Sequence, residues 1–193
     1  MVDQPPTQFG AVIALAGRRI DAEGSDPPRF PLLNAPLVRK RLAEVFAAES
    51  MVALVCSAAC GADLIALEEA ERVGRKRRIV LPFSRERFRA TSVVDRPGEW
   101  GPVFDRLVAA ADAAGDLVVL DEGIVGDEAA AYAAANEAII REAQALARAG
   151  GTPRRSVAVV VWEGAARAKS DATEDFRRLA ATAGFEDRAV LTL

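Results

Sequence analysis

Residues 51–63, MVALVCSAACGAD, and residues 11–17, AVIALAG, decide the fold expected for this chain. Each segment is an apolar run that ends in small residues, and residues 62–73 after the longer segment have the composition of an amphipathic helix. Runs that are apolar throughout are typical of parallel strands covered on both faces. A strand, a small-residue turn and a helix form the repeating unit of an open α/β sheet.

The same unit recurs along the chain. Strands are predicted at Ala11–Ala16, Met51–Cys56, Arg78–Leu81, Leu117–Leu120, Ser156–Trp162 and Ala189–Leu193. Helices are predicted at Ala35–Glu49, Ala62–Val73, Pro102–Ala114, Glu128–Ala149 and Ala172–Ala183. This alternation predicts a Rossmann-like, doubly wound and mainly parallel sheet of about five to seven strands, with helices on both faces. A length of 193 residues suits one domain covering residues 1–193.

Composition excludes several classes of site. The chain has no histidine, which removes Ser-His-Asp and Cys-His nucleophile systems and His-ligated metals. Cys56 and Cys60 alone cannot supply a four-ligand metal site, so we expect neither a metal nor a cofactor. A formal net charge of −3 argues against a general nucleic-acid binder. Without a signal-like N-terminus or a membrane-length apolar run, we expect a cytoplasmic protein with no membrane partner.

The predicted topology sorts the loops into two groups. In open α/β sheets, ligands bind outside the carboxyl ends of the strands. The loops that follow predicted strands are residues 17–29, 57–61, 82–96, 121–126 and 163–171. The basic run Arg75–Arg78 follows a helix instead, so we predict a solvated turn facing away from the site. Neither Gly-Lys nor Gly-x-Gly occurs, which disfavours a P-loop and a dinucleotide fingerprint.

The turn from Ser57 to Asp63 has two interpretations. Its small residues, among them Ala58, Gly61 and Ala62, would let backbone amides approach an anion at a helix N-terminus. They would equally suit a tight turn that only packs. A carboxylate would repel phosphate, so we expect Asp63 to meet a ribose hydroxyl or a backbone amide.

Two further loops carry candidate residues. Gly17 permits a sharp turn, and Arg18 and Arg19 beside it are either a phosphate clamp or surface arginines. Near the end of the chain, Glu163 and Gly164 close a predicted strand and Asp171 starts a helix. Asp171 with Glu174 fits a capping box, while the same helix start with Thr173 forms another possible anion site.

These motifs together resemble the SLOG superfamily of nucleotide-binding domains. The resemblance lies in AGRRID after the first strand, SAACGAD after the second, IVLPF at the third, Tyr132 with Asn136 on one helix face, and VWEG before DATEDF. This superfamily includes the DNA-processing DprA proteins, the LOG phosphoribohydrolases and sensor domains of bacterial signalling and defence proteins. The sensor domains, which lie beside effector modules, are the most similar.

The resemblance implies a site for a nucleotide or nucleotide-derived ligand, serving as a sensor or regulatory module. By position it assigns ligand contacts to Gly17, Arg18, Ser57, Ala58, Gly61, Asp63, Asp171 and Thr173, and we add their neighbours Arg19, Ala62, Glu163 and Gly164 to the candidate site. Phe83 is a further candidate that could stack a base, although a core anchor is the more common role of such a residue. Asp171 and Ala172 replace the glycines that the family often has before its threonine. Tyr132 and Asn136 are either core residues or ligand contacts. The expected partners are a small-molecule nucleotide, a fused or associated effector module and, through the Ala-rich helix 128–149, a second copy of the chain.

Two alternatives remain at this point. A LOG-like nucleotide N-glycosidase would use Glu163, Glu174 or Asp175, although the family's catalytic glutamate lies three residues after the threonine, where this chain has Phe176. A DprA-like single-strand DNA binder would use Arg85, Arg87 and Arg89, which share one side only if the segment is extended. Glu174 and Asp175 do not occupy the position of the family's catalytic glutamate, and a shift of one residue turns a helical side chain by about 100°. This favours a binding module over an enzyme.

Overall fold

The protein forms an all-parallel α/β sheet in the computed structural model, which describes residues 10–120, 128–149, 152–166 and 171–193. Six strands pair in the order β4-β3-β2-β1-β5-β6. Their bounds are β1 Ala11–Gly17, β2 Ala53–Cys56, β3 Lys76–Leu81, β4 Leu117–Val119, β5 Arg155–Trp162 and β6 Glu186–Leu191. The α/β, doubly wound fold that the sequence predicted is confirmed. The predicted loop Asp121–Gly126 lies outside the described residues.

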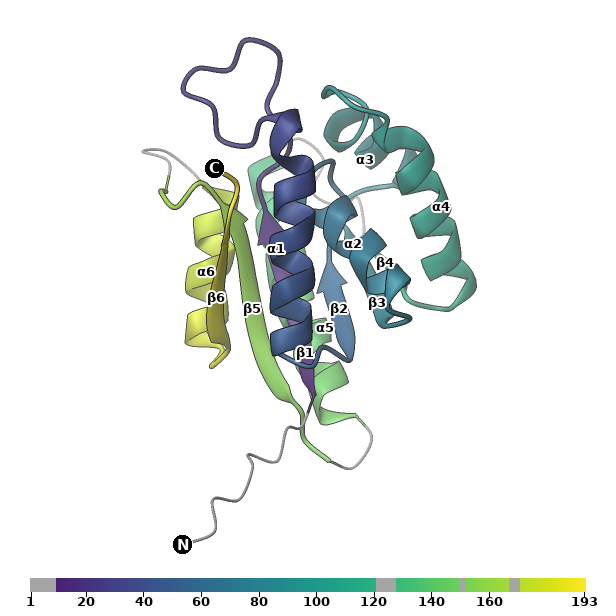
Figure 1. The fold of residues 1–193 in the computed structure, drawn as a ribbon. Coiled ribbons are helices and arrows are strands. Elements are labelled where there is room, and N and C mark those ends of the chain that lie inside the picture. The colour runs from purple at the N-terminus through teal and green to yellow at the C-terminus, as the bar shows by residue number, and fades with distance from the viewer. Residues whose placement is uncertain (1–9, 121–127, 150–151, 167–170) are drawn as a thin grey trace, which may run out of the picture.

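Helices cover both faces of the sheet, as Figure 1 shows. Their bounds are α1 Ala35–Ala48, α2 Ala62–Arg72, α3 Arg85–Ser92, α4 Trp100–Ala113, α5 Glu128–Arg148 and α6 Ala172–Thr182. In β1, Ile13 and Leu15 point into the core under α1, α2 and α4, whereas Val12 and Ala14 point into the core under α5 and α6. Two cores sharing one sheet explain why the strands are apolar throughout.

The order of the strands places a switch point beside β1. The chain runs from β1 outward through β2, β3 and β4, then returns across the sheet to β5 on the other side of β1. Crossover connections are right-handed, so helices that lead toward β4 lie on one face of the sheet and helices that lead toward β6 lie on the other. Helices α1 to α4 therefore cover one face, and α5 and α6 cover the opposite face. The carboxyl ends of β1, β2 and β5 therefore meet where ligands bind in such sheets.

Three local predictions need correction. The segment Arg85–Ser92, predicted as loop, is helix α3, because Ser84 accepts a hydrogen bond from the Arg87 amide and so caps it. The basic run predicted as a solvated turn opens β3 instead. Lys76 and Arg78 both bind Asp116 there, at 2.5 and 2.9 Å, which neutralises them within the sheet edge. Strand β6 begins at Glu186, three residues before the predicted start at Ala189.

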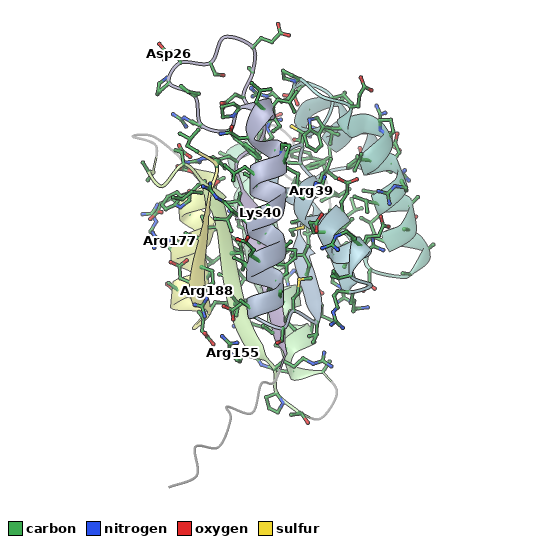
Figure 2. All side chains as sticks on the ribbon, viewed as in Figure 1. Asp26, Arg39, Lys40, Arg155, Arg177 and Arg188 are labelled. Atoms are coloured by element: carbon green, nitrogen blue, oxygen red, sulfur yellow. The ribbon has the colours of Figure 1, made fainter. Side chains whose placement is uncertain are left out.

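The two ends of the sheet differ in their charged groups. Figure 2 labels Asp26 near the carboxyl ends of the strands and Arg155 near their amino ends. At the amino ends, Arg155 and Arg188 hold Glu49 between them at 2.8 and 2.5 Å. The buried alanines of α5 face the sheet, whereas Ala129, Ala133 and Ala145 are exposed on its outer side. None of the described helices is long and apolar enough to cross a membrane.

Candidate functional site

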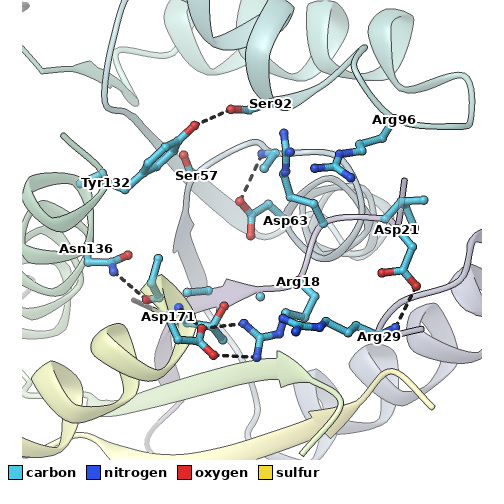
Figure 3. Close-up of a pocket in the computed structure, with 18 of the residues that line it drawn as sticks. Arg18, Asp21, Arg29, Ser57, Asp63, Ser92, Arg96, Tyr132, Asn136 and Asp171 are labelled. Carbon is cyan, nitrogen blue, oxygen red and sulfur yellow. Dashed lines mark hydrogen bonds and ion pairs between the residues drawn. The ribbon is translucent and has the colours of Figure 1, made fainter. Parts of the chain in front are cut away.

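A cleft of about 660 Å³ opens at the carboxyl ends of β1 and β2. Its walls come from the loop after β1 (residues 18–29), the β2–α2 turn, the end of α3 with Arg96 beyond it, and the first turns of α5 and α6. Figure 3 shows how these elements, far apart in the sequence, bring their polar side chains around one space. The cleft therefore lies at the place that the topology predicts for a ligand.

Arg18 anchors one side of the cleft through buried ion pairs. Its guanidinium is 5% exposed and donates to Glu163 Oε2 at 2.6 Å, to both Asp171 oxygens at 2.6 and 2.8 Å, and to the carbonyl of Ala165 at 3.0 Å. Burial by itself would raise the pKa of Asp171, but the hydrogen bonds and charge of Arg18 outweigh it and lower that pKa. Arg18 thus ties the β1 loop to β5 and α6, and its donors are committed to the protein.

Asp171 also caps α6. Its Oδ1 accepts hydrogen bonds from the amides of Thr173 and Glu174, at 3.1 and 3.4 Å. The capping part of the sequence prediction is confirmed. Because a carboxylate of the protein already occupies this helix start, its positive end is satisfied without a ligand.

The β2–α2 turn packs closely against the β1 loop. Gly61 has a φ of +93°, and a Cβ there would lie 2.8 Å from the Ile20 amide nitrogen and 2.9 Å from the Arg18 carbonyl oxygen. A Cβ on Gly17 would lie 2.4 Å from that of Ala62. Both glycines are therefore needed for contact between protein segments. Of the turn's amides, those of Cys60 and Ala62 donate to the carbonyls of Ser92 and Arg18.

Asp63 lies in this turn with few partners. The residue is 6% exposed, and its Oδ2 accepts from the Ala59 amide at 3.2 Å. Its Oδ1 has no hydrogen-bond partner within the described part of the chain. Burial raises the pKa of Asp63 to about 7, opposed only by the Ala59 amide. Asp63 is thus a buried acid in the cleft wall whose acceptor capacity is mostly unused.

Three arginines form what we call the arginine rim of the cleft: Arg19, Arg29 and Arg96. Arg19 and Arg96 share a single carboxylate, that of Asp95, at 3.0 and 3.3 Å. Arg29 lies 3.7 Å from Glu163, which Arg18 already engages. Among the described residues, the buried Nη1 of Arg29 has no hydrogen-bond partner, and the buried Nε of Arg96 lies 3.3 Å from Asp95 Oδ2 without forming a hydrogen bond. The rim therefore keeps positive charge and donors in excess of its own acids.

About half of the predicted ligand contacts line the cleft: Gly17, Arg18, Arg19, Ser57, Asp63, Asp171 and Thr173. The others, which lie outside its wall, are Ala58, Gly61, Ala62, Phe83, Glu163 and Gly164. Ala58, Ala62 and Phe83 are core residues. Glu163 binds Arg18 with both oxygens, at 2.6 and 3.2 Å. Of the other catalytic candidates, Glu174 does not line the cleft, and Asp175 pairs with Arg178 on the surface of α6.

Sequence reasoning missed or left open several residues of the wall. Asp21, Arg29 and Arg96 follow strands, so only their loop positions marked them. Tyr132 bonds through its hydroxyl to Ser92 at 2.8 Å and packs edge-on against Phe83. Asn136 donates from its amide to the Ala172 carbonyl at 2.9 Å. Tyr132 and Asn136, labelled in Figure 3, thus line the cleft and also hold its wall together.

The arginines considered for DNA binding lie on α3 and are largely paired. Arg89 binds Asp105 at 3.0 Å, and Arg85 donates to the Asp105 carbonyl at 3.1 Å. Arg87 stacks over the Phe83 ring at 4.2 Å and lies 3.6 Å from Glu128. Because the segment is helical, these side chains do not form the single row that an extended strand would present.

Comparison with known proteins adds no assignment to this geometry. No family model matches the sequence, and no curated protein matches it significantly.

Proposed function

We propose that the protein binds a nucleotide or nucleotide-derived molecule in this cleft, as a sensor or regulatory module. The observation that carries the proposal is the pairing of the arginine rim, which has unused donors, with Asp63, which has unused acceptor capacity, in one cleft. A phosphate would take the rim's donors, because the guanidinium fork matches phosphate oxygens. An uncharged, hydroxyl-bearing part of the same ligand would meet Asp63.

Size and position agree with this proposal. Small-molecule sites usually have volumes of roughly 300–1,000 Å³ and sit at switch points of α/β sheets. At the start of α2 the amides of Ala62 and Leu64 donate to the carbonyls of Arg18 and Ala59, and α6 is capped by Asp171, so the proposal assigns the anion to the rim and not to a helix dipole. Recognition of this kind needs no group that titrates like histidine, and the chain has none.

Titration calorimetry with AMP, ADP and ADP-ribose tests the proposal. We expect binding by at least one of them, and we expect Arg96→Gln to weaken it by about 10- to 100-fold, because a hydrogen bond to a charged group contributes about 1.5–3 kcal/mol. Arg178→Gln removes an exposed arginine outside the cleft and should leave the affinity unchanged. Absence of binding to all three, or equal effects of the two variants, would contradict the proposal.

The two alternatives have less support from the geometry. The three carboxyl groups predicted for an N-glycosidase are not available in the cleft wall, because Glu163 is held by Arg18, and Glu174 and Asp175 lie outside the wall. Chromatography for free base released from nucleoside monophosphates measures this activity directly. The arginines on α3 are paired with acids, so we expect weak binding of single-stranded DNA. A gel shift at low salt measures this binding.

A further inference from the structure

The acids in the cleft wall differ in how much acceptor capacity they have left. Asp171 binds Arg18 and caps α6. Asp21 accepts from the amides of Arg29 and Phe30 at 2.8 and 2.9 Å, which folds the loop after β1. Glu128 and Asp26 are exposed. Asp63 is buried, and within the described part of the chain it accepts one hydrogen bond, from the Ala59 amide to Oδ2, while Oδ1 accepts none.

The surroundings of Asp63 favour an uncharged donor as its partner. None of the described arginines or lysines forms an ion pair with it, so an anionic ligand group beside it would be repelled. Its pKa near 7 has burial as its largest cause, which is the behaviour of a carboxyl group that lacks a partner in the free protein. A ligand hydroxyl would supply that partner without adding charge.

Ser57, from the same turn, offers a second acceptor. Its hydroxyl donates to the Val80 carbonyl at 2.8 Å, so its proton is committed and its oxygen lone pairs remain. Figure 3 shows Ser57 and Asp63 on the same side of the cleft, across from Arg18 and Asp171. Ser57 and Asp63 thus place two acceptor groups in the cleft wall, and the two hydroxyls of the vicinal diol of ribose are donors of the kind that such groups bind.

We infer that Asp63, with Ser57, binds the 2′,3′-diol of the ligand and makes the cleft selective for ribonucleotides over 2′-deoxyribonucleotides. The inference rests on the proposed function, since the rim must hold the phosphate for the sugar to reach this turn. Asp63 thereby determines specificity, and the arginine rim supplies most of the charge recognition.

Calorimetric affinities for AMP and 2′-deoxy-AMP test the inference. At pH 8, where Asp63 with its pKa of about 7 is mostly ionised, we expect the wild-type protein to bind AMP about 10- to 100-fold more tightly, because the lost hydroxyl leaves a charged acceptor without its hydrogen bond. In Asp63→Asn the preference should fall to within about threefold, mainly through weaker binding of AMP. Asp175→Asn changes an exposed acid on the surface of α6, outside the cleft wall, and should keep the wild-type preference. Ser57→Ala, a second variant of the turn, should reduce the preference in part.

Each result separates the two claims. If the wild type binds AMP and 2′-deoxy-AMP equally while Arg96→Gln still weakens both, the ribose inference is wrong and the proposed function stands. If GMP binds far more tightly than AMP, and Asp63→Asn removes that difference without changing the ribose preference, Asp63 binds a guanine edge and the inference is overturned. If none of the nucleotides binds, the proposed function itself fails.

Discussion

Asp63 and Asp171 start from equivalent positions and end in opposite states. Each lies at the start of a helix that follows a strand adjacent to β1, and each is 6% exposed. Asp171 meets the guanidinium of Arg18 and its pKa is lowered, whereas Asp63 meets one amide and its pKa is raised to about 7. The difference shows that the direction in which Arg18 turns decides which acid is structural and which is available to a ligand.

Among the variants that test this difference between Asp171 and Asp63, removal of Arg18 should change the free energy of unfolding most. Arg18→Ala leaves the carboxylates of Glu163 and Asp171 buried without their cation, and we expect a loss of about 3–5 kcal/mol in the free energy of unfolding. Urea denaturation at pH 7 measures it. Arg178→Ala, which breaks an exposed pair on α6, should cost less than about 0.5 kcal/mol. A loss below about 1 kcal/mol for Arg18→Ala would mean that the buried pairs do not hold the β1 loop.

Neutralising Asp63 should raise the free energy of unfolding, whereas removing Arg18 lowers it. Its pKa in the folded protein, about 7, lies above its ordinary value of 3.8, so the ionisation of Asp63 costs no stability below about pH 4, destabilises the protein increasingly between about pH 4 and 7, and costs a constant amount above that. Asp63→Asn should therefore be more stable than the wild type by about 4 kcal/mol at pH 8 and by only about 1 kcal/mol at pH 4.5. Denaturation curves at both pH values, without ligand, measure the difference. A constant difference between the two proteins would show that Asp63 is not buried as a lone acid.

The smallest predicted effect separates the two roles of Asp171. Asp171→Asn removes the charge that Arg18 binds but keeps an oxygen for the Thr173 amide. Asp171→Ala removes both and should be less stable than Asp171→Asn by about 1 kcal/mol, the usual contribution of a helix cap. Thermal denaturation of the two variants gives this difference. Equal stabilities would assign the whole effect of Asp171 to its ion pair.

Most of the fold could be predicted from local sequence, and the exceptions have local causes. The strands β1, β2 and β5 are long apolar runs, and such runs carry a strong signal. Helix α3 was missed because its residues RERFRATS are mostly polar and only one aromatic, Phe88, packs into the core. The basic start of β3 was taken for a turn because its charges are compensated by Asp116, which is distant in the sequence.

The candidate site was harder to predict than the fold. Loop position alone identified Gly17, Ser57 and Asp63 correctly as residues of the cleft wall. The same loops contain Ala58 and Phe83, which pack in the core, because a loop position says nothing about the direction of a side chain. For Phe83 this is the core role that the sequence had left open. Arg29 and Arg96 were passed over since isolated arginines in loops carry no pattern.

By itself, the sequence determined the alternation of strands and helices, the sheet edge at which a site must lie and, through the absence of histidine, the chemistry available there. Tertiary structure decided the partners. Arg18 reaches Glu163 and Asp171, which are 145 and 153 residues away, and so leaves Asp63 without a cation. Apolar periodicity is a local property that burial enforces along each element, whereas the pairing of charges depends on which loops the folded sheet brings together.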